Sequence, residues 1–127
     1  MNKVLIFLKS FFKPKKSEEI FEDENITNGL LKYKQNDFCS AINYFNSALI
    51  NSPDDENIYY LRAKAKFAMD DLAGAIEYYS KVIEKSPEDI YYYERGMIRY
   101  FIHDWEGAIE DFTNIIELNP ANENAYI

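Results

Sequence analysis

The chain has 127 residues, which is enough for one domain or for a short repeat array with a tail. Its hydrophobic fraction of 47% excludes wholesale disorder, and its single cysteine excludes an internal disulfide or a cysteine metal cluster. Residues 1–16 carry five lysines and no acidic residue, whereas the rest of the chain carries nine basic and 22 acidic residues. Because this acidic part of the chain repels the phosphate backbone of nucleic acids, we expect no nucleic-acid binding.

The first segment, residues 1–17, is basic and amphipathic, and it begins MNKVLIFLKSFFKPKK. Its apolar run is far too short to span a bilayer, which takes ~20 residues. Two roles stay open for it. It could form a helix on an anionic membrane surface with Leu5, Leu8 and Phe12 inserted, or it could pack on the rest of the chain, which we favour. We expect a cytoplasmic protein, and the alternative is a scaffold tethered to a membrane surface by residues 1–16.

A repeat follows, with intervals of 34 and 33 residues between the same markers. Three prolines keep these intervals. Five further sets of three residues do so too: one of aspartates, one of alanines, one of aromatic residues, one of apolar residues and one of small residues. The sets are Pro53, Pro87 and Pro120; Asp37, Asp71 and Asp104; Ala41, Ala75 and Ala108; Phe45, Tyr79 and Phe112; Ala48, Val82 and Ile115; and Gly29, Ala63 and Gly96. The register predicts three copies within residues 18–122, at about 22–55, 56–88 and 89–122.

Each copy is predicted to form two antiparallel helices. Apolar residues recur at helical spacing in the second half of each copy, as in Ala75, Ile76, Tyr79, Val82 and Ile83. Between the halves stand pairs of residues that can end one helix and cap the next, namely Asn36-Asp37, Asp70-Asp71 and His103-Asp104. No stretch alternates with the period of a strand, so the predicted fold is all-α.

The small residues of the first helices indicate close helix packing. Gly29, Ala63 and Gly96 lie mid-helix, where glycine costs ~1 kcal/mol relative to alanine. We expect the repeated alanines of the second helices to meet these small residues. The repeated aromatic residues would then fill the gap between successive pairs.

The strings YYLRAKAKFAMDDLAGAIEYYSKVIEKSP and YYYERGMIRYFIHDWEGAIEDFTNIIELNP resemble tetratricopeptide repeats. Residues 22–55 resemble the family less closely, since Asn25 stands where a large aromatic residue is usual. The resemblance implies a right-handed α-solenoid of three helix pairs, preceded here by the N-terminal amphipathic helix. It also implies a protein-protein interaction module that is not an enzyme and needs no cofactor or metal.

In this family the first helices line a concave groove that holds a peptide or helix of a partner. The groove positions map here onto Ile26, Leu30, Tyr33, Lys34, Asn57, Tyr60, Lys64, Phe67, Ile90, Tyr93, Met97, Tyr100 and Phe101. One subfamily clamps the carboxylate of a chaperone tail, but the matching positions here are Ile26, Leu30, Leu61, Ile90 and Glu94. The resemblance therefore implies a partner with an apolar or aromatic segment, with basic flanks drawn by the acidic body.

Candidate catalytic groups are few. His103 beside Asp104 falls in a predicted turn, and Cys39 is expected to be a packing residue. Asp104, Glu106, Glu110 and Asp111 are expected to form a solvated helix face. We therefore expect no catalytic site and no metal site.

The C-terminal residues 123–127 are interpreted as the start of a further, truncated helix. Repeat arrays usually end in a polar capping helix, and here the apolar stripe of residues 108–116 would be only partly covered. We expect this end to pair with a second copy of the chain or with a partner.

Overall fold

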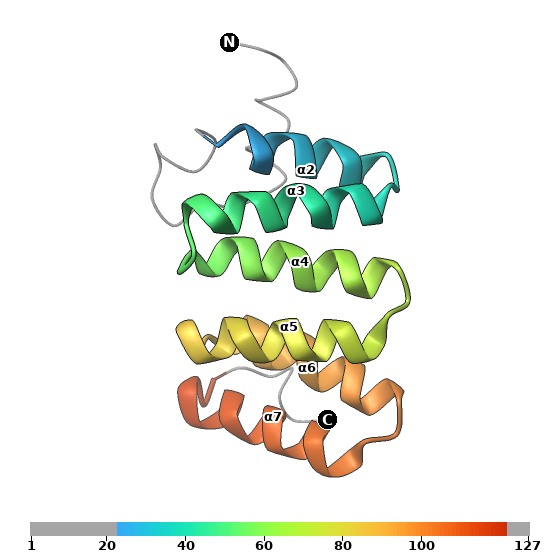
Figure 1. The fold of residues 1–127 in the computed structure, drawn as a ribbon. Helices are drawn as coiled ribbons and strands as arrows, with labels where there is room; N and C mark the ends of the chain where they lie inside the picture. The colour runs from blue at the N-terminus through green and yellow to red at the C-terminus, as the bar shows by residue number, and fades with distance from the viewer. Residues whose placement is uncertain (1–22, 122–127) are drawn as a thin grey trace. The chain divides into compact units, whose positions relative to one another are not determined.

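The computed structural model describes residues 23–121, and every regular element in that range is an α-helix (Figure 1). The helices are α2 (Glu24–Lys34), α3 (Phe38–Asn51), α4 (Glu56–Ala68), α5 (Leu72–Lys85), α6 (Asp89–Phe101) and α7 (Trp105–Leu118). They follow one another as three pairs, each joined internally by a short turn. This is the all-α helical repeat fold that the sequence predicts.

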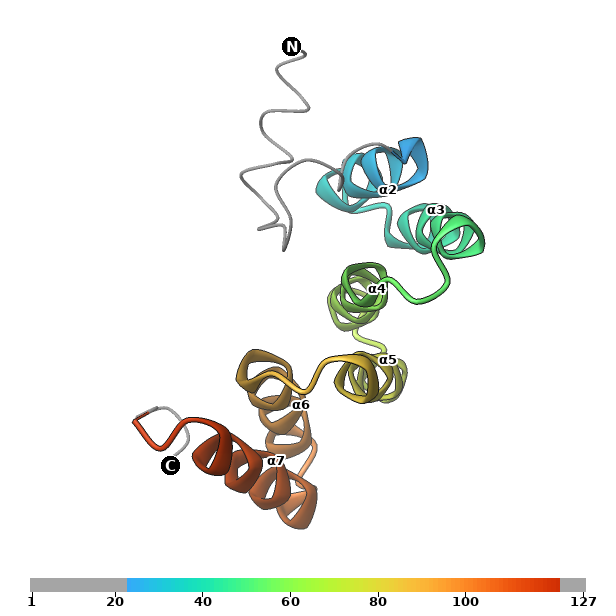
Figure 2. The same cartoon turned by 90° about the vertical axis from the view of Figure 1, so that its left-hand side faces the viewer.

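Two compact units divide the chain, residues 1–58 and residues 59–127. The described part of the first unit holds α2, α3 and the start of α4, and α2 packs along α3. The second unit holds the rest of α4 with α5, α6 and α7. Within it, α6 packs against both α5 and α7, as the view along the helices in Figure 2 shows.

The turn inside each pair follows the same backbone path in all three copies. Its second residue has a positive φ, which asparagine and aspartate tolerate better than most residues. These residues are Asn36, Asp70 and His103, at 63°, 64° and 68°. The aspartate that follows caps the next helix by accepting a hydrogen bond from a backbone N–H, in Asp37, Asp71 and Asp104. The predicted breaks and caps are confirmed.

The core of each pair is built from the apolar stripe of the second helix. In α3 the buried members include Ala41, Phe45 and Ala48. The equivalent residues of α5 and α7 are also buried, namely Ala75, Tyr79 and Val82, and Ala108, Phe112 and Ile115. These stripes were predicted from the helical spacing of their apolar residues.

The small residues of the first helices face an aromatic ring, and here the sequence prediction was wrong in part. A side chain on Gly29 would meet the ring of Phe45 first, and one on Gly96 would come within 2.8 Å of the Phe112 ring. The aromatic residue therefore covers the glycine within its own pair, where we expected an alanine. The rotation of the second helix about its axis decides which residue faces the glycine.

Two predicted segments, residues 1–17 and residues 123–127, lie outside the described residues. Within the part that is described, no helix is long and apolar enough to cross a membrane. The membrane contacts predicted for Leu5, Leu8 and Phe12 therefore stay a prediction.

Candidate functional site

One face of α6 presents a row of large apolar side chains, which we call the α6 stripe: Ile90, Tyr93, Met97, Tyr100 and Phe101. Their spacing of three or four residues, or multiples of it, brings them to one side of the helix. Ile90 is 45% exposed, Met97 38% and Phe101 75%, and Tyr100 is also exposed. Tyr93 is half-buried because its ring packs 6.3 Å from that of Phe112.

The neighbouring first helix in the same unit, α4, contributes residues of more varied exposure. Phe67 is exposed near its C-terminal end. Tyr60 is half-buried, and the Lys64 ammonium lies 5.4 Å from the centre of its ring. The Tyr60 hydroxyl donates hydrogen bonds to the Glu94 carboxylate of α6 at 2.8 and 3.1 Å. These bonds connect the N-terminal half of α4 to the middle of α6.

The first unit offers less surface than the sequence predicts. Ile26 is 5% exposed and Leu30 only 1%, so both belong to the core of the α2–α3 pair and present no surface to a partner. Tyr33 is half-buried, with its ring edge against Phe38, and Lys34 is exposed.

The remaining predicted residue of the groove, Asn57, is half-buried in the first turn of α4. Its backbone N–H donates to the carboxylate of Asp55 at 2.9 Å. That bond caps the start of the helix. The Asn57 side chain takes no part in it.

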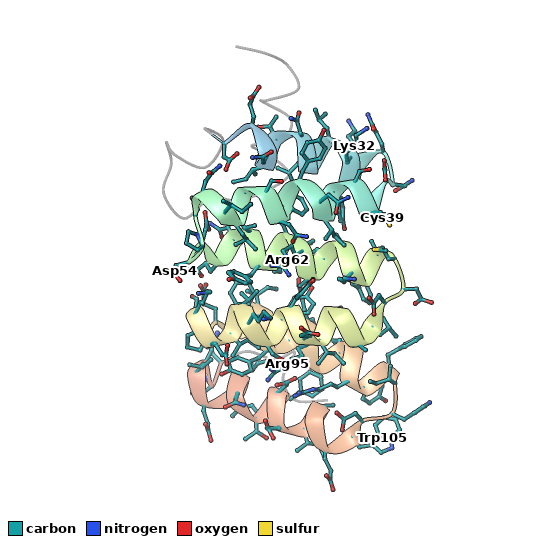
Figure 3. The ribbon with its side chains drawn as sticks, viewed as in Figure 1. Lys32, Cys39, Asp54, Arg62, Arg95 and Trp105 are labelled. Atoms are coloured by element: carbon teal, nitrogen blue, oxygen red, sulfur yellow. The ribbon has the colours of Figure 1, made fainter. Side chains whose placement is uncertain are left out.

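An aromatic cluster beyond the α6 stripe was not predicted. Tyr100 and His103 both place their rings edge-on to Trp105, at 5.1 and 5.0 Å between centres. Trp105 starts α7 and is exposed, and Figure 3 shows it beside the α6–α7 turn. The sequence signal was available, because Trp105 directly follows the turn residues His103-Asp104.

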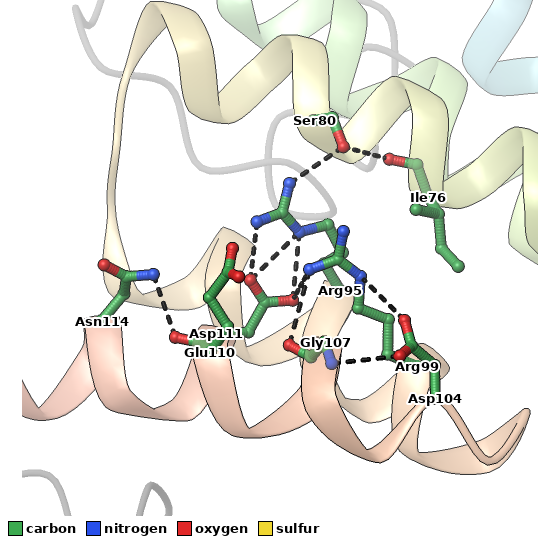
Figure 4. A network of polar contacts seen from close by, with 9 residues as sticks. All are labelled: Ile76, Ser80, Arg95, Arg99, Asp104, Gly107, Glu110, Asp111 and Asn114. Atoms are coloured by element: carbon green, nitrogen blue, oxygen red, sulfur yellow. Dashed lines mark hydrogen bonds and ion pairs between the residues drawn. The ribbon is translucent and has the colours of Figure 1, made fainter.

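Between α6 and α7 lies a buried ionic network (Figure 4). Asp111 is completely buried, and its carboxylate accepts from Nε of Arg95 at 3.0 and 3.2 Å and from Nη2 of Arg95 at 2.6 Å. Arg99 donates to the same carboxylate at 3.1 Å, and Arg95 reaches Ser80 of α5 at 2.9 Å. The network therefore links α5, α6 and α7.

This network corrects the prediction of a solvated acidic face. Asp104, Glu106 and Glu110 are exposed as expected, but Asp111 is not. Its carboxylate can be buried because two guanidinium groups compensate the charge and satisfy its oxygens.

The second repeat fills the equivalent positions with different chemistry. Arg62 stands in register with Arg95, and its guanidinium lies 4.0 Å from the ring centre of Tyr78, which occupies the position of Asp111 in the repeat. A cation–π contact thus takes the place of the ion pair. Equivalent positions of the two repeats therefore pair an arginine with a tyrosine ring in one copy and with a carboxylate in the other.

Two of the cap residues have a lowered pKa. The hydrogen bonds from Ser40 lower the pKa of Asp37 below 3.8, its usual value. The backbone N–H of Gly74 lowers the pKa of Asp71 in the same way, helped by Lys66, whose ammonium lies 3.1 Å from the carboxylate. Both caps are therefore held in their charged form.

No catalytic constellation gathers in the described part of the chain. His103 is a turn residue whose ring lies edge-on to that of Trp105. Cys39 is a free, exposed thiol, so its prediction as a packing residue was wrong. Among residues 23–121 no group of three or more His, Cys, Asp or Glu side chains is placed to hold a metal ion.

Comparison with solved structures finds several similar folds. The first tetratricopeptide domain of Spaghetti, solved with an HSP90 peptide, is 23% identical with a TM-score of 0.69 over 80% of this chain and 82% of that one. The second such domain of human RPAP3, solved with an HSP70 peptide, is 20% identical, with a TM-score of 0.69 over 80% and 85%. MamA of Desulfovibrio magneticus RS-1 is 23% identical, with a TM-score of 0.71 over 94% and 66%. At these identities the likeness shows the fold.

A comparison with curated proteins finds no match. Residues 26–90, just over half of the chain, match the family described as tetratricopeptide repeat. The match spans the first two helix pairs and reaches the start of α6. This chain therefore belongs to the tetratricopeptide repeat family.

Proposed function

We propose that this protein is a non-catalytic interaction module that binds a peptide or helix of a partner protein on the α6 stripe and the adjoining residues of α4. The observation that carries the proposal is the exposure of Ile90, Met97 and Phe101 on one side of one helix. Large apolar side chains grouped in this way are costly to leave in water, and they mark interaction surfaces.

The helix α4 adds Phe67, which is exposed, and the stem of Lys64. In the first unit, Tyr33, Lys34 and Asn57 keep the partner-contact role predicted from the family resemblance. Ile26 and Leu30 are left out because both are buried.

The chemistry of the partner follows from the charges around the α6 stripe. The HSP90 and HSP70 peptides bound to two of the similar domains both end in Glu-Glu-Val-Asp. Such an acidic end would approach Glu94 here, in a unit with seven basic and 13 acidic residues. We therefore propose a partner segment that is apolar or aromatic and carries basic residues.

A peptide selection tests this proposal. A display library of random peptides of about 12 residues is selected on the full chain, and the enriched peptides are measured by fluorescence anisotropy. The stripe variant carries Ile90→Ala, Met97→Ala and Phe101→Ala. The matched control carries Ile109→Ala and Leu118→Ala, which remove apolar side chains of α7 that are 65% and 51% exposed.

We expect the stripe variant to weaken binding about tenfold or more, since each lost contact removes part of the buried apolar area. The control should bind within about twofold of the original chain. Equal losses in both variants would show that the selected peptides recognise exposed apolar surface in general, and the proposal would fail.

A further inference from the structure

The Glu94 carboxylate is held in a fixed position by two tyrosine hydroxyls. Tyr60 of α4 donates to Oε1 at 2.8 Å and to Oε2 at 3.1 Å, and Tyr79 of α5 donates to Oε2 at 2.9 Å. Glu94 itself belongs to α6, so three helices of the second unit meet at this group. A carboxylate oriented by two donors keeps free acceptor capacity, because its oxygens together offer about four acceptor sites.

Tyr60, which orients this carboxylate, belongs to an aromatic cluster in which Tyr79 and Tyr91 are buried. The ring centre of Tyr60 lies 5.0 Å from that of Tyr91 and 6.1 Å from that of Tyr79. Aromatic faces are electron-rich and attract cations, which is already visible in the Lys64 ammonium 5.4 Å from the centre of the Tyr60 ring. The half-buried Tyr60 ring therefore adds an aromatic face that favours positive charge beside the fixed negative charge of Glu94.

Glu94 differs from Asp111 and Asp71, two other carboxylates of this unit. Asp111 is paired with Arg95 and Arg99, and Asp71 is paired with Lys66. Among the described residues, no ion pair joins Glu94 to a lysine or arginine. Its carboxylate is partly buried, and the side-chain donors that reach it within residues 23–121 are the two tyrosine hydroxyls.

The position of Glu94 connects it to the α6 stripe. Ile90 lies four residues before it and Met97 three residues after it, which places both exposed side chains on the same side of the helix. A segment that covered Ile90 and Met97 would pass over the Glu94 carboxylate. A basic residue between two apolar residues of that segment would then meet the free acceptor sites.

We propose that the Glu94 carboxylate, oriented by the hydroxyls of Tyr60 and Tyr79, binds one lysine or arginine side chain of the bound peptide. This inference rests on the proposed function, because it places the basic residue within the segment that covers the α6 stripe. The ligand is therefore a peptide in which a basic residue is flanked by apolar ones.

The test repeats the peptide selection with two further variants of the full chain. Glu94→Gln keeps the size of the side chain and removes its charge. The control Glu77→Gln removes an exposed carboxylate of α5 that lies two residues before Tyr79, about 200° around the helix from it. Both variants change the net charge of the chain equally.

On the original chain and on Glu77→Gln, the selection should enrich lysine or arginine between two apolar positions. The enriched peptide should lose about fivefold in affinity when its basic residue is replaced by glutamine, as for a partly exposed charge pair. On Glu94→Gln this loss should fall below about twofold, while the apolar peptide still binds.

Two outcomes would overturn the inference. Selected peptides that depend on the α6 stripe but show the same basic preference on Glu94→Gln would remove Glu94 as the site. Selected peptides that show no enrichment of lysine or arginine would also contradict a role of Glu94 as the site. Neither result would contradict the proposed function. A selection that enriches no peptide dependent on the α6 stripe would instead contradict the proposed function, and this inference with it.

Discussion

Replacing Asp111 with alanine should destabilise the second unit far more than replacing its neighbour Glu110. Asp111 has no exposed surface, and its partner Arg95 is 8% exposed. Removing one member of a buried pair leaves the other charge uncompensated, at a cost of about 3–5 kcal/mol. Glu110 is exposed, and its carboxylate makes none of the contacts of the network, so Glu110→Ala should change the free energy of unfolding by less than about 0.5 kcal/mol.

The loss expected for Asp111→Ala is large beside the stability of a unit of this size. A domain of about 70 residues is stabilised by roughly 3–10 kcal/mol in total. A loss of 3–5 kcal/mol would lower its Tm by about 15 °C or more, or would unfold it at room temperature.

Tryptophan fluorescence during urea unfolding measures this effect directly. Trp105 is the only tryptophan of the chain and begins α7, so its emission reports on the unit that contains the network. A second variant that replaces both partners with apolar residues, Arg95→Met with Asp111→Leu, should recover part of the loss. A midpoint for Asp111→Ala that matches that of Glu110→Ala would refute the reasoning.

Four further predictions concern the turns, the packing and the N-terminal segment. Gly96→Ala should lower the free energy of unfolding by about 1–3 kcal/mol despite the better helix propensity of alanine, because the added carbon meets the Phe112 ring; Phe112→Leu should relieve this in chemical denaturation. Asp70→Val should be less stable than Asp70→Gly by about 1–2 kcal/mol by the same measurement, because φ is positive at this residue. The pKa of Asp71 lies below 3.8 in the folded state, so its contribution to stability is present above that pH and is lost as the pH falls through and below it. Between about pH 5 and pH 3, Asp71→Asn, which keeps a neutral cap, should therefore lose less in Tm than the original chain, and an equal loss would contradict this. If residues 1–16 bind anionic membranes, Leu5→Ser with Leu8→Ser and Phe12→Ser should abolish flotation of the chain with anionic liposomes, and absence of flotation in the original chain would end that alternative.

The helix boundaries and caps could be predicted because they depend on a few consecutive residues. A helical apolar period, a turn dipeptide such as Asp70-Asp71 and a repeat register all act over short distances along the chain. The same local reasoning placed His103 in a turn, and its positive φ agrees with that position.

The burial of Asp111 could not be predicted in this way. Nothing near it in the sequence distinguishes it from Glu110, and its partners Arg95 and Arg99 lie on the preceding helix. The contact of Gly96 with Phe112 and the burial of Leu30 likewise depend on how each helix is rotated against its neighbour. Such rotations follow from packing across the pair, which a single sequence does not display.

The candidate site, too, could be predicted from the sequence only in part. The family resemblance predicted which residues of α6 line the groove, and the exposure of Ile90, Met97 and Phe101 in the structure makes that face a candidate surface. The role of Glu94 needed the structure, because the tyrosines that hold it come from α4 and α5, 34 and 15 residues away in sequence.

The central claim is that the α6 stripe is the surface on which a partner peptide lies. Amide chemical shifts of the isotope-labelled full chain, recorded while a selected peptide is added, test it most directly. The account predicts that the largest shifts fall on residues 90–101 of α6 and on the C-terminal half of α4. Shifts confined to α7, or to the first unit alone, would contradict it.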